Sequence, residues 1–391
     1  MPNKSLTRAK NAKNDEFYTQ WADIEKEVQA YLEFNPDVFC NKTILCPCDD
    51  PEWSNFTKFF ALHFQEYGLK KLISTSYAVE SKTYKEGYQL TLFEKNDPKF
   101  DKKKTRTNGK IFILDSKGIN KKININDLKW NYMEEDGDFR SVEVKKLRDE
   151  ADVIITNPPF SLFNDFLVWV TELKKQFLII ANKNAITNKE LFPFIKTNKI
   201  WSGVTGWSGG MWFETKNIND VDKVVNGINM KNVSSIFLTN LDHGRRHQPL
   251  QLMTMEDNLK YSRHKEIKGK KSYDKYDNYD AIEVPYTDAI PSNYAGIMGV
   301  PISFLDKYCP DQFVIMGATQ RGCHDEVPDT KKYDDYWEVR PNGTPTGSSG
   351  GKTNENANLL GNDGKKNYFI NKQGRIIQSA YSRIFIKNKG I

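Results

Sequence analysis

The stretch TILCPCDDPEWSNFTKFFALHFQEYGLKKLIST, residues 43–75, decides the fold class of this chain. Its short apolar start, residues 43–46, is typical of a buried strand, and a loop rich in proline and aspartate follows. Ser54 can cap a helix with aromatic residues on one face, and Gly68 ends it before a second apolar run at residues 71–75. A strand, a helix and a strand within about thirty residues form a βαβ unit with parallel strands.

The alternation of strands and helices continues further along the chain. Residues 151–156 and 176–181 are expected to form buried strands with a helix between them. Residues 210–213 and 235–239 have no long helical segment between them, so we expect them to pair antiparallel at the sheet edge. The sequence therefore predicts an α/β fold with an open, mostly parallel, Rossmann-like sheet and an antiparallel edge hairpin.

Two regions depart from this pattern. Residues 88–93 and 110–114 are expected to form a hairpin, inserted into the sheet domain at about residues 82–125. Beyond about residue 250 the composition changes, which indicates a second domain. We therefore expect a first domain at residues 1–250 and a smaller, irregular α+β domain at residues 251–391.

Within the second domain, residues 342–367 are dominated by Gly, Asn, Ser, Thr and Lys. Segments of this composition contain too few apolar side chains to form a core of their own. We expect a mobile loop there.

Composition excludes several classes of protein. Of the 391 residues, 38% are hydrophobic and 28% are charged, and no apolar stretch is long enough to span a bilayer. The basic N-terminus has no apolar segment after it, so we expect no signal peptide. The five cysteines are scattered and predict no disulfide framework, which indicates a reducing cytoplasm. The net charge of +6 is too small to establish nucleic-acid binding by itself.

The tetrapeptide Asn157-Pro158-Pro159-Phe160 directly follows an expected strand, at the edge where open α/β sheets bind ligands. The amino group of adenine is a poor nucleophile because its lone pair is delocalised into the ring. The amide oxygen of Asn157 and the carbonyl of Pro158 can accept hydrogen bonds from its two N–H groups and favour a pyramidal nitrogen. Phe160 offers an apolar face on which an extruded base can stack. These residues predict methyl transfer to N6 of adenine.

Other interpretations of this tetrapeptide stay open at this point. An Asn-Pro-Pro sequence can simply form the turn that ends a strand. Protein glutamine methyltransferases use a similar loop for an amide nitrogen, although they have a Gly-rich cofactor loop, which residues 46–51 do not supply. A DNA-binding protein with a methyltransferase fold and no activity is the third alternative.

The chain resembles the EcoRI-type adenine-specific DNA methyltransferases, a branch of the class I S-adenosylmethionine-dependent enzymes. The matching stretches, in the order of the family, are Asn14-Asp-Glu-Phe-Tyr-Thr-Gln20, Cys48-Asp-Asp-Pro51 with Ser54-Asn-Phe56, Gly137-Asp-Phe-Arg-Ser141, Thr156-Asn-Pro-Pro-Phe-Ser-Leu-Phe163, Thr239-Asn-Leu-Asp-His243 and Gly299-Val-Pro-Ile-Ser-Phe-Leu-Asp306. The resemblance implies a seven-stranded methyltransferase sheet, S-adenosyl-L-methionine as cofactor, and double-stranded DNA as substrate. Residues 251–391 would then recognise the DNA target.

The resemblance also implies a set of cofactor contacts. The residues concerned are Phe17, Tyr18, Thr19, Cys46, Asp49, Asp50, Asp138 and Phe139. The N-terminal three would hold the methionine end, although Thr19 can alternatively cap the helix that follows. Residues 46–51 would pass under the methionine and ribose, where most relatives have a Gly-rich turn. Asp138 and Phe139 would grip the adenine of the cofactor, unless Asp138 is only a turn residue.

Basic clusters are candidates for DNA contacts because they can neutralise phosphates, although solvated loops are the alternative. The residues concerned are Lys102, Lys103, Lys104, Arg106, Arg245, Arg246, Lys268, Lys270 and Lys271. The glycine-rich segment 203–210 lacks the Lys-Ser/Thr ending of a P-loop, and we expect a flexible loop near the target base. Cys46 and Cys48 lack a second ligand pair, so we predict no metal site.

Partners are implied by the resemblance alone. We expect a monomer that acts on duplex DNA as part of, or derived from, a restriction-modification system. A paired restriction endonuclease would share the DNA site without direct contact, and no membrane would be involved. Such a protein would be encoded by a bacterium, an archaeon or a phage.

Overall fold

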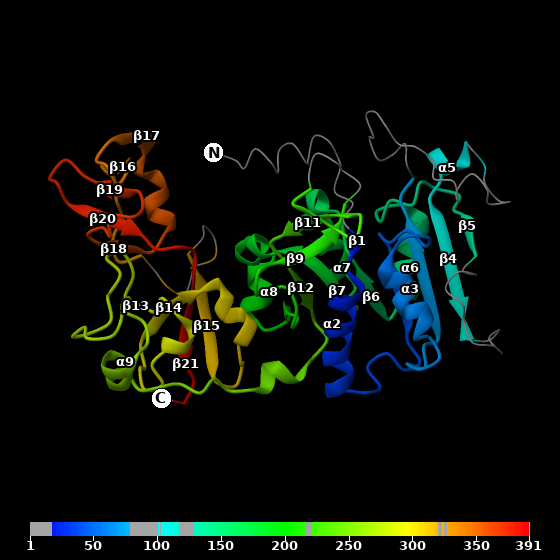
Figure 1. Ribbon diagram of the computed structural model, residues 1–391, viewed down its shortest axis with the longest axis horizontal. Coiled ribbons are helices and arrows are strands. Elements are labelled where there is room, and N and C mark those ends of the chain that lie inside the picture. Colours follow the sequence, from blue (N-terminus) through cyan, green and yellow to red (C-terminus); the bar gives the residue numbers. More distant parts are fainter. Residues whose placement is uncertain are drawn as a thin grey trace. The chain divides into compact units, whose positions relative to one another are not determined.

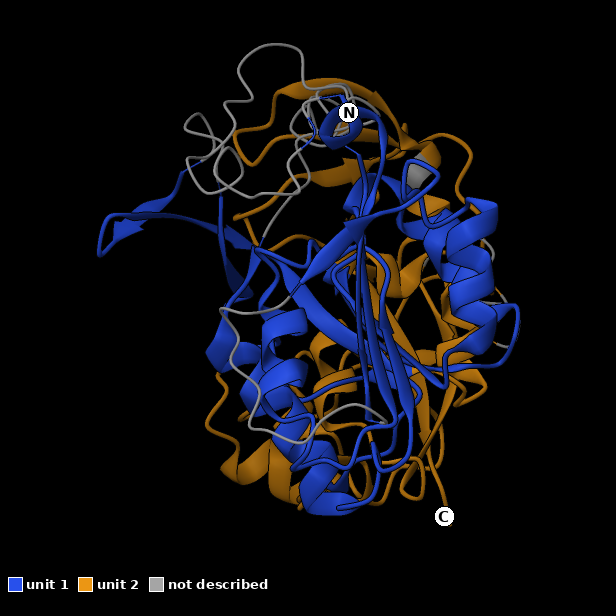
Figure 2. Cartoon of the chain, turned by 90° about the vertical axis from the view of Figure 1, so that its right-hand side faces the viewer, with its two compact units in different colours: residues 1–183, 201–244 blue, residues 184–200, 245–391 orange. Residues whose placement is uncertain are grey.

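The computed structural model describes residues 18–78, 101, 103–116, 129–215, 221–319, 323, 327 and 329–390. The chain divides into two compact units, which Figure 2 shows in different colours. Unit 1 comprises residues 1–183 and 201–244, and unit 2 comprises residues 184–200 and 245–391. The inclusion of residues 184–200 in unit 2 was not predicted, and the roles expected for the two domains stay predictions.

Unit 1 contains an eight-stranded sheet with the order β5-β4-β3-β2-β6-β7-β12-β8 (Figure 1). Its strands are β2 (Thr43–Cys46), β3 (Lys71–Ser76), β4 (Lys110–Asp115), β5 (Trp130–Tyr132), β6 (Val153–Thr156), β7 (Gln176–Asn182), β8 (Trp201–Ser202) and β12 (Ser235–Thr239). The four central strands are parallel, whereas β4 and β12 join this group antiparallel on its two sides. This mixed α/β architecture confirms the predicted fold class at that level.

Three details of the sheet differ from the predictions. The number seven is not confirmed, because the sheet has eight strands among the described residues. The expected pairing of residues 210–213 with 235–239 is wrong: β12 pairs with β7 and β8, and β9 (Met211–Glu214) lies in another sheet. Apolar alternation identifies a strand but does not specify its partner. Of the expected hairpin, residues 88–93 lie outside the described residues, and β4 pairs with β3 and β5.

A second, antiparallel sheet in unit 1 has the order β1-β9-β11-β10. Its other strands are β1 (Tyr18–Thr19), β10 (Lys223–Val225) and β11 (Ile228–Val233). Strand β1 pairs with β9 so that Thr19 lies opposite Phe213. This sheet therefore brings the N-terminal segment beside a strand that lies far along the chain.

Helices cover both faces of the main sheet, because the connections β2–β3 and β6–β7 lead in opposite directions along the strand order. The connection from β2 to β3 passes through α3 (Asn55–Leu62), and the connection from β6 to β7 passes through α7 (Phe163–Thr171). Since β3 and β7 lie on opposite sides of the β2–β6 pair, right-handed crossovers put these two helices on opposite faces. The other helical segments in the described part of unit 1 include α2 (Trp21–Phe34), α5 (Lys104–Thr107), α6 (Val142–Glu150) and the 3-10 turn η3 (Phe160–Leu162).

Aromatic and aliphatic side chains of α2 and α3 form one core with alternate residues of the sheet. The shared core includes Ile24, Val28, Phe56, Phe59, Phe60, Ile44, Val153, Ile155, Leu178 and Ile180. Ser54 caps α3 as predicted, because its hydroxyl accepts hydrogen bonds from the amides of Phe56 (3.1 Å) and Thr57 (3.5 Å). The capping role considered for Thr19 is wrong: Gln20 precedes α2, without a side-chain capping bond.

Unit 2 contains two further sheets, with the orders β13-β14-β21-β15 and β17-β16-β19-β20-β18. Their strands are β13 (Ala281–Glu283), β14 (Ile297–Pro301), β15 (Phe313–Ala318), β16 (Trp337–Val339), β17 (Pro345–Ser349), β18 (Asn358–Leu360), β19 (Tyr368–Ile370), β20 (Ile376–Ser379) and β21 (Arg383–Asn388). The helical segments described in unit 2 are α8 (Phe192–Lys196), α9 (Met255–Tyr261), η7 (Thr287–Ala289), η8 (Ile302–Lys307) and η9 (Gly350–Glu355). Two 3-10 segments, η4 (Lys183–Thr187) and η6 (Gly244–His247), span the boundaries between the units along the chain.

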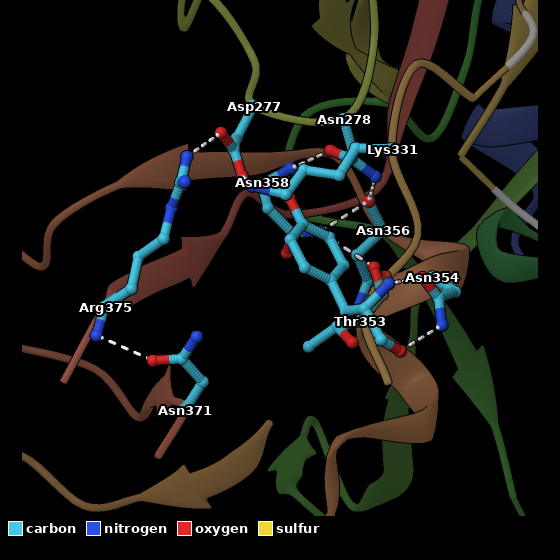
Figure 3. A network of polar contacts seen from close by, with 10 residues as sticks. Asp277, Asn278, Lys331, Thr353, Asn354, Asn356, Asn358, Asn371 and Arg375 are labelled. Atoms are coloured by element: carbon cyan, nitrogen blue, oxygen red, sulfur yellow. Dashed lines mark hydrogen bonds and ion pairs between the residues drawn. The ribbon is translucent and has the colours of Figure 1, made fainter. Parts of the chain in front are cut away.

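The mobile loop expected at residues 342–367 is wrong, because β17, η9 and β18 lie in this segment. Polar side chains order it by bonding to the backbone (Figure 3). Asn358 is fully buried, and its side-chain amide donates to the carbonyl of Thr353 (2.7 Å) while its backbone amide donates to Asn278 (2.9 Å). Nearby, Asp277 accepts hydrogen bonds from Lys331 (3.0 Å) and Arg375 (2.6 Å).

Within the described part of the chain, no helix combines the length and apolar character needed to cross a membrane.

Candidate active site

The carboxyl ends of β2 and β6 lie side by side at the centre of the main sheet. From β2 the chain turns toward β3, and from β6 it turns toward β7, so the two loops diverge at this point. Such a reversal of strand order opens a crevice at the carboxyl edge, where α/β sheets bind their ligands. The loops that follow the two strands contain Asp49 and Asn157.

Asn157 begins the stiff loop that follows β6. Pro158 is buried, Pro159 is half-buried, and the half-buried Phe160 begins the turn η3. The backbone amide of Asn157 donates a hydrogen bond to the carboxylate of Asp49, and the side-chain oxygen of Asn157 is a buried atom. The ring of Phe160 meets the ring of Phe213 edge-on at a centroid distance of 6.5 Å.

Asp49 lies at the centre of a hydrogen-bond network between the two loops. Its side chain accepts hydrogen bonds from the hydroxyls of Ser54 (2.6 Å) and Thr156 (2.5 Å). Burial raises the pKa of this carboxyl to about 6, although the hydrogen bonds from Ser54, Thr156 and the Asn157 amide act to lower it. The neighbouring Asp50 is half-buried and accepts a hydrogen bond from the backbone amide of Glu52 (2.9 Å).

The segment predicted to hold the methionine end of the cofactor lies partly in β1. Tyr18 and Thr19 pair with β9, and the side chain of Asn55 donates to the carbonyl of Thr19 (2.7 Å), which joins β1 to the start of α3. The hydroxyl of Thr19 is buried and has no hydrogen-bond partner within the described residues. Phe17 lies outside the described residues. An orphaned buried hydroxyl of this kind fits a contact with a polar ligand.

The segment with Asp138 and Phe139 lies beside the carboxyl end of β3. The amide of Ala78, just beyond β3, donates to the carbonyl of Asp136 (2.7 Å). Gly137 has a φ of +77°, and a Cβ there would lie 2.1 Å from the carbonyl oxygen of Ser76, so only glycine fits this close approach. This segment is thus fixed next to the strand that neighbours β2.

The side chains of this segment already have protein partners. Asp138 forms a bidentate pair with Arg140, through bonds of 2.9 and 2.7 Å. Phe139 is buried and packs edge-on against Phe166 (5.1 Å) and Trp169 (5.7 Å). Phe139 therefore contributes to the core, and its predicted contact with the cofactor stays a prediction.

Cys46 is the last residue of β2, and its side chain is fully buried in the core. Burial raises the pKa of its thiol well above the usual value, and the charge of Asp49 raises it further. A buried neutral thiol of this kind packs like a small apolar side chain. Of this residue, only the backbone fits the predicted role under the cofactor.

Comparison with known proteins identifies the family. A family model described as "Adenine-specific methyltransferase EcoRI" matches residues 5–389. The chain belongs to this family. The methyltransferase is 42% identical to the Type II methyltransferase M.EcoRI of Escherichia coli over 320 residues, which are 80% of this chain and 89% of that protein. It is also 33% identical to M.MpnI of Mycoplasma pneumoniae, over 80% of this chain and 84% of that protein. No solved structure matches it.

Family membership settles the class of activity. The chain is an adenine-specific DNA methyltransferase of the Type II kind, and S-adenosylmethionine is its methyl donor. The resemblance seen in the sequence is thereby confirmed. The residues that bind the cofactor and perform the transfer stay predictions.

The glycine-rich segment 203–210 of the methyltransferase is held at several points. Glu27 of α2 is fully buried, and its carboxylate accepts hydrogen bonds from the backbone amides of Val204 (3.0 Å) and Thr205. At the other end, Asn232 donates to the carbonyl of Gly209 (3.0 Å). Sequence reasoning missed Glu27, because a glutamate in a helix is typically solvent-exposed.

Lys183 contacts Trp207 at the carboxyl edge of the main sheet. Lys183 follows β7, and its ammonium donates to the carbonyl of Trp207 (2.9 Å) and lies 6.0 Å from the centre of that indole ring. The backbone amide of Lys183 donates to Ser234, just before β12. The segment 203–210 thus reaches the carboxyl edge at which Asn157 lies.

The residues predicted to contact DNA differ in exposure. Those of α5 and its start, Lys103, Lys104 and Arg106, are exposed, as are Lys268, Lys270 and Lys271 of unit 2, whereas Lys102 lies outside the described residues. Lys270 forms an ion pair with Asp274 (2.5 Å). Arg245 forms an ion pair with Asp306 (2.6 Å). Arg246 is buried and donates to Asn198 (2.6 Å), so its guanidinium fits a structural role better than a phosphate contact.

The described residues include no cluster of three or more His, Cys, Asp or Glu side chains that could hold a metal ion.

Proposed function

We propose that unit 1 transfers a methyl group to the N6 atom of an adenine that has left the DNA helix, and that Asn157 and Pro158 hold the amino group. One observation carries this proposal. Three predicted contact segments lie at the carboxyl ends of three adjacent strands, in the order Asp138 beside β3, Asp49 after β2 and Asn157 after β6. This order matches a cofactor lying along the edge, with its adenine near β3 and its methyl group near β6.

Bound S-adenosylmethionine would supply an electrophilic methyl group on its sulfonium. The chain supplies acceptors for the adenine amine: the buried amide oxygen of Asn157 and the carbonyl of Pro158. Two hydrogen bonds to these acceptors draw the amine out of conjugation with the ring and make its lone pair available. The two prolines restrict the backbone, so these acceptors stay in place while the base enters.

Phe160 is proposed to stack against the extruded base. Its ring is half-buried and is supported edge-on by Phe213, whose own side chain is fully buried. A supported aromatic ring can offer a face to a purine without changing its rotamer. Base-modifying enzymes commonly read and hold a flipped base between apolar side chains.

The cofactor would be held by Tyr18, Thr19, Asp50 and the backbone of residues 46–51. The orphaned hydroxyl of Thr19 supports this assignment, because a polar ligand group would satisfy it. Unit 1 would then be a Rossmann-like catalytic domain, and unit 2 would contribute the DNA target-recognition surface. We further propose that the methyltransferase acts as a monomer beside a restriction endonuclease that it does not contact.

Replacing Asn157 with alanine tests the proposed transfer site. We expect Asn157→Ala to abolish methylation of duplex DNA, measured with a radiolabelled methyl donor, and to leave the Kd of the cofactor nearly unchanged in calorimetry. The matched control is Asn164→Ala, an exposed asparagine of α7, which should retain full turnover. Turnover in the Asn157 variant close to that of the control would refute the role of Asn157.

A further inference from the structure

Asp49 connects the loop after β2 to the loop after β6. Its Oδ1 accepts a hydrogen bond from the Ser54 hydroxyl (2.6 Å), and its Oδ2 accepts one from the Thr156 hydroxyl (2.5 Å). The backbone amide of Asn157 also donates to this carboxylate. One side chain therefore bonds to the start of α3, to the last residue of β6 and to the first residue of the proposed transfer loop.

The backbone of Asp49 is fixed as well. Its amide donates to the carbonyl of Thr75 (3.0 Å), and its carbonyl accepts a hydrogen bond from the hydroxyl of Ser74 (2.5 Å). Both of these partners belong to β3. The backbone of Asp49 is thus bonded to β3, while its carboxylate bonds to Thr156 at the end of β6. The side chain cannot rotate away without breaking its own hydrogen bonds.

This geometry leaves little of the carboxylate for a ligand. An ionised carboxylate offers about four acceptor positions, and here at least three donors from the chain use them. The residue is only 6% exposed. About one acceptor position is therefore left for a direct bond from the ribose or the ammonium of the cofactor.

We propose that Asp49 is a positioning residue for methyl transfer: its buried carboxylate sets the place of Asn157 relative to the cofactor loop. The proposal rests on the transfer role proposed above for Asn157. In the proposed complex, the cofactor contacts the loop of residues 46–51, and the amine of the target adenine contacts Asn157. The carboxylate spans these two loops, so it fixes the distance between the two reactants.

The pKa of Asp49 provides a second measurement, the pH profile of kcat/KM. A residue that only stabilises the fold would not affect this profile. Burial raises this pKa to about 6, with a smaller contribution from the charge of Asp50, and the thiols of Cys46 and Cys48 are the other titratable groups nearby. Above this pKa all the donors find an acceptor. Protonation turns one oxygen into a donor and removes one acceptor position, so the bonds to Ser54, Thr156 and Asn157 must rearrange.

The test compares Asp49→Asn with Asp152→Asn as a matched control. Asp152 joins the opposite ends of the same two strands, because its side chain accepts a hydrogen bond from the amide of Thr43 (2.8 Å) at the start of β2. Both substitutions remove one charge from a carboxylate that links β2 to β6. Only Asp49 lies at the carboxyl edge.

We expect Asp49→Asn to lower kcat about 100-fold, the loss typical of a misplaced reacting group, while the Kd of S-adenosylmethionine changes less than about threefold. In the wild type, kcat/KM should fall below about pH 6, since this ratio reports the pKa values of the free enzyme. The asparagine variant should lose that acidic limb. Asp152→Asn should keep both the turnover and the limb.

Thr156→Val provides a second variant in case Asp49→Asn does not fold, which circular dichroism would reveal. It removes one donor and keeps the carboxylate, so we expect a smaller loss of kcat, about tenfold, and an acidic limb that is retained. A raised Kd for the cofactor with kcat unchanged would instead make Asp49 a cofactor ligand. The proposal would also be overturned if Asp49→Asn and Thr156→Val had the same kcat and the same pH dependence of kcat/KM as Asp152→Asn.

The two proposals can fail separately. Full turnover by Asn157→Ala would refute the transfer site itself. An inactive Asn157→Ala together with a fully active Asp49→Asn would refute only the positioning role.

Discussion

Removing the buried carboxylate of Glu27 should destabilise unit 1. Three groups donate to this side chain: the hydroxyl of Tyr31 (2.6 Å), the amide of Val204 (3.0 Å) and the amide of Thr205. Gly203 lies so close that a Cβ placed there would come within 1.8 Å of the carboxylate, so the surrounding chain is packed around it. The substitution Glu27→Ala therefore leaves three buried donors without their acceptor.

The expected loss follows from these three donors. Each unsatisfied buried donor costs about 1–3 kcal/mol, so the sum for three donors is about 3–9 kcal/mol. Removal of the carboxylate also relieves the cost of burying a charge, which offsets part of the loss. We therefore expect Glu27→Ala to lower the free energy of unfolding by about 3–5 kcal/mol. Glu27→Gln keeps one acceptor oxygen and should lose less.

The pH dependence of this loss has a definite sign. Burial raises the pKa of Glu27 above its usual value of 4.5. A group with a raised pKa in the folded state contributes stability below its unfolded pKa, and this contribution is lost as pH rises through the folded pKa. The alanine variant lacks it altogether. The difference between wild type and variant should therefore be larger at pH 5 than at pH 8.

Urea unfolding at the two pH values measures this difference, provided that the slope with denaturant stays constant. Glu25→Ala is the matched control, because Glu25 is an exposed residue of the same helix and gains the same helix propensity. A loss below about 1 kcal/mol for Glu27→Ala would show that the three donors find other partners, and the reasoning would then be wrong. An equal loss in Glu27→Gln would refute the role assigned to the acceptor oxygens.

Two further predictions concern DNA. Phe160→Ala should weaken methylation by the value of one stacking contact, about 1–3 kcal/mol, seen as a loss in kcat/KM on duplex DNA; an unaltered value would exclude stacking on this ring. Lys268 and Lys271 are exposed, whereas Lys270 is held by Asp274. Replacing the first two with glutamine should reduce the slope of log affinity against log salt by about two, and an unchanged slope would place them away from the phosphates.

The local elements of the sheet were largely predictable from the sequence. Apolar runs locate β2 and β3, and the hydroxyl of Ser54 caps α3 as its position before the aromatic stripe indicates. The end of α3 was less predictable: the helix stops at Leu62, and Gly68, with a φ of +61°, ends only the turn that follows. A helical stripe of aromatic residues continues to pack through such a turn, so the pattern overestimates the length of the helix.

Long-range pairing was not predictable, because it depends on partners far apart in the chain. Thr19 looks like a helix cap locally, yet it pairs with Phe213 in a separate small sheet. The polar segment 342–367 looks like a loop, yet the buried backbone amide of Asn358 donates to the side chain of Asn278, which lies 80 residues earlier in the chain. In both cases the decisive contact lies outside the window in which a local pattern is read.

For the site, the sequence predicted the place of residues 157–160 after β6, but it did not predict which residues hold this loop. The roles predicted for Asp49 and Cys46 came from their place in the cofactor loop. In the structure Asp49 bonds to Ser54 and Thr156, and the thiol of Cys46 lies in the core. A loop position indicates that a residue lies near a ligand, but it does not indicate which way the side chain points.

The loop after β2 shows how a site can be built without the Gly-rich turn that most class I relatives have at this place. None of the residues 47–51 has a positive φ, so this loop does not need the freedom of glycine. Hydroxyl groups hold it instead: Thr75 donates to the carbonyl of Pro47 (3.0 Å), and Thr156 accepts from the amide of Cys48 (3.3 Å). Because side chains of the neighbouring strands hold this loop, a shift of either strand would move the loop as well. Its geometry therefore depends on β3 and β6 together, which is why a change at Thr156 should reach both the cofactor and the transfer loop.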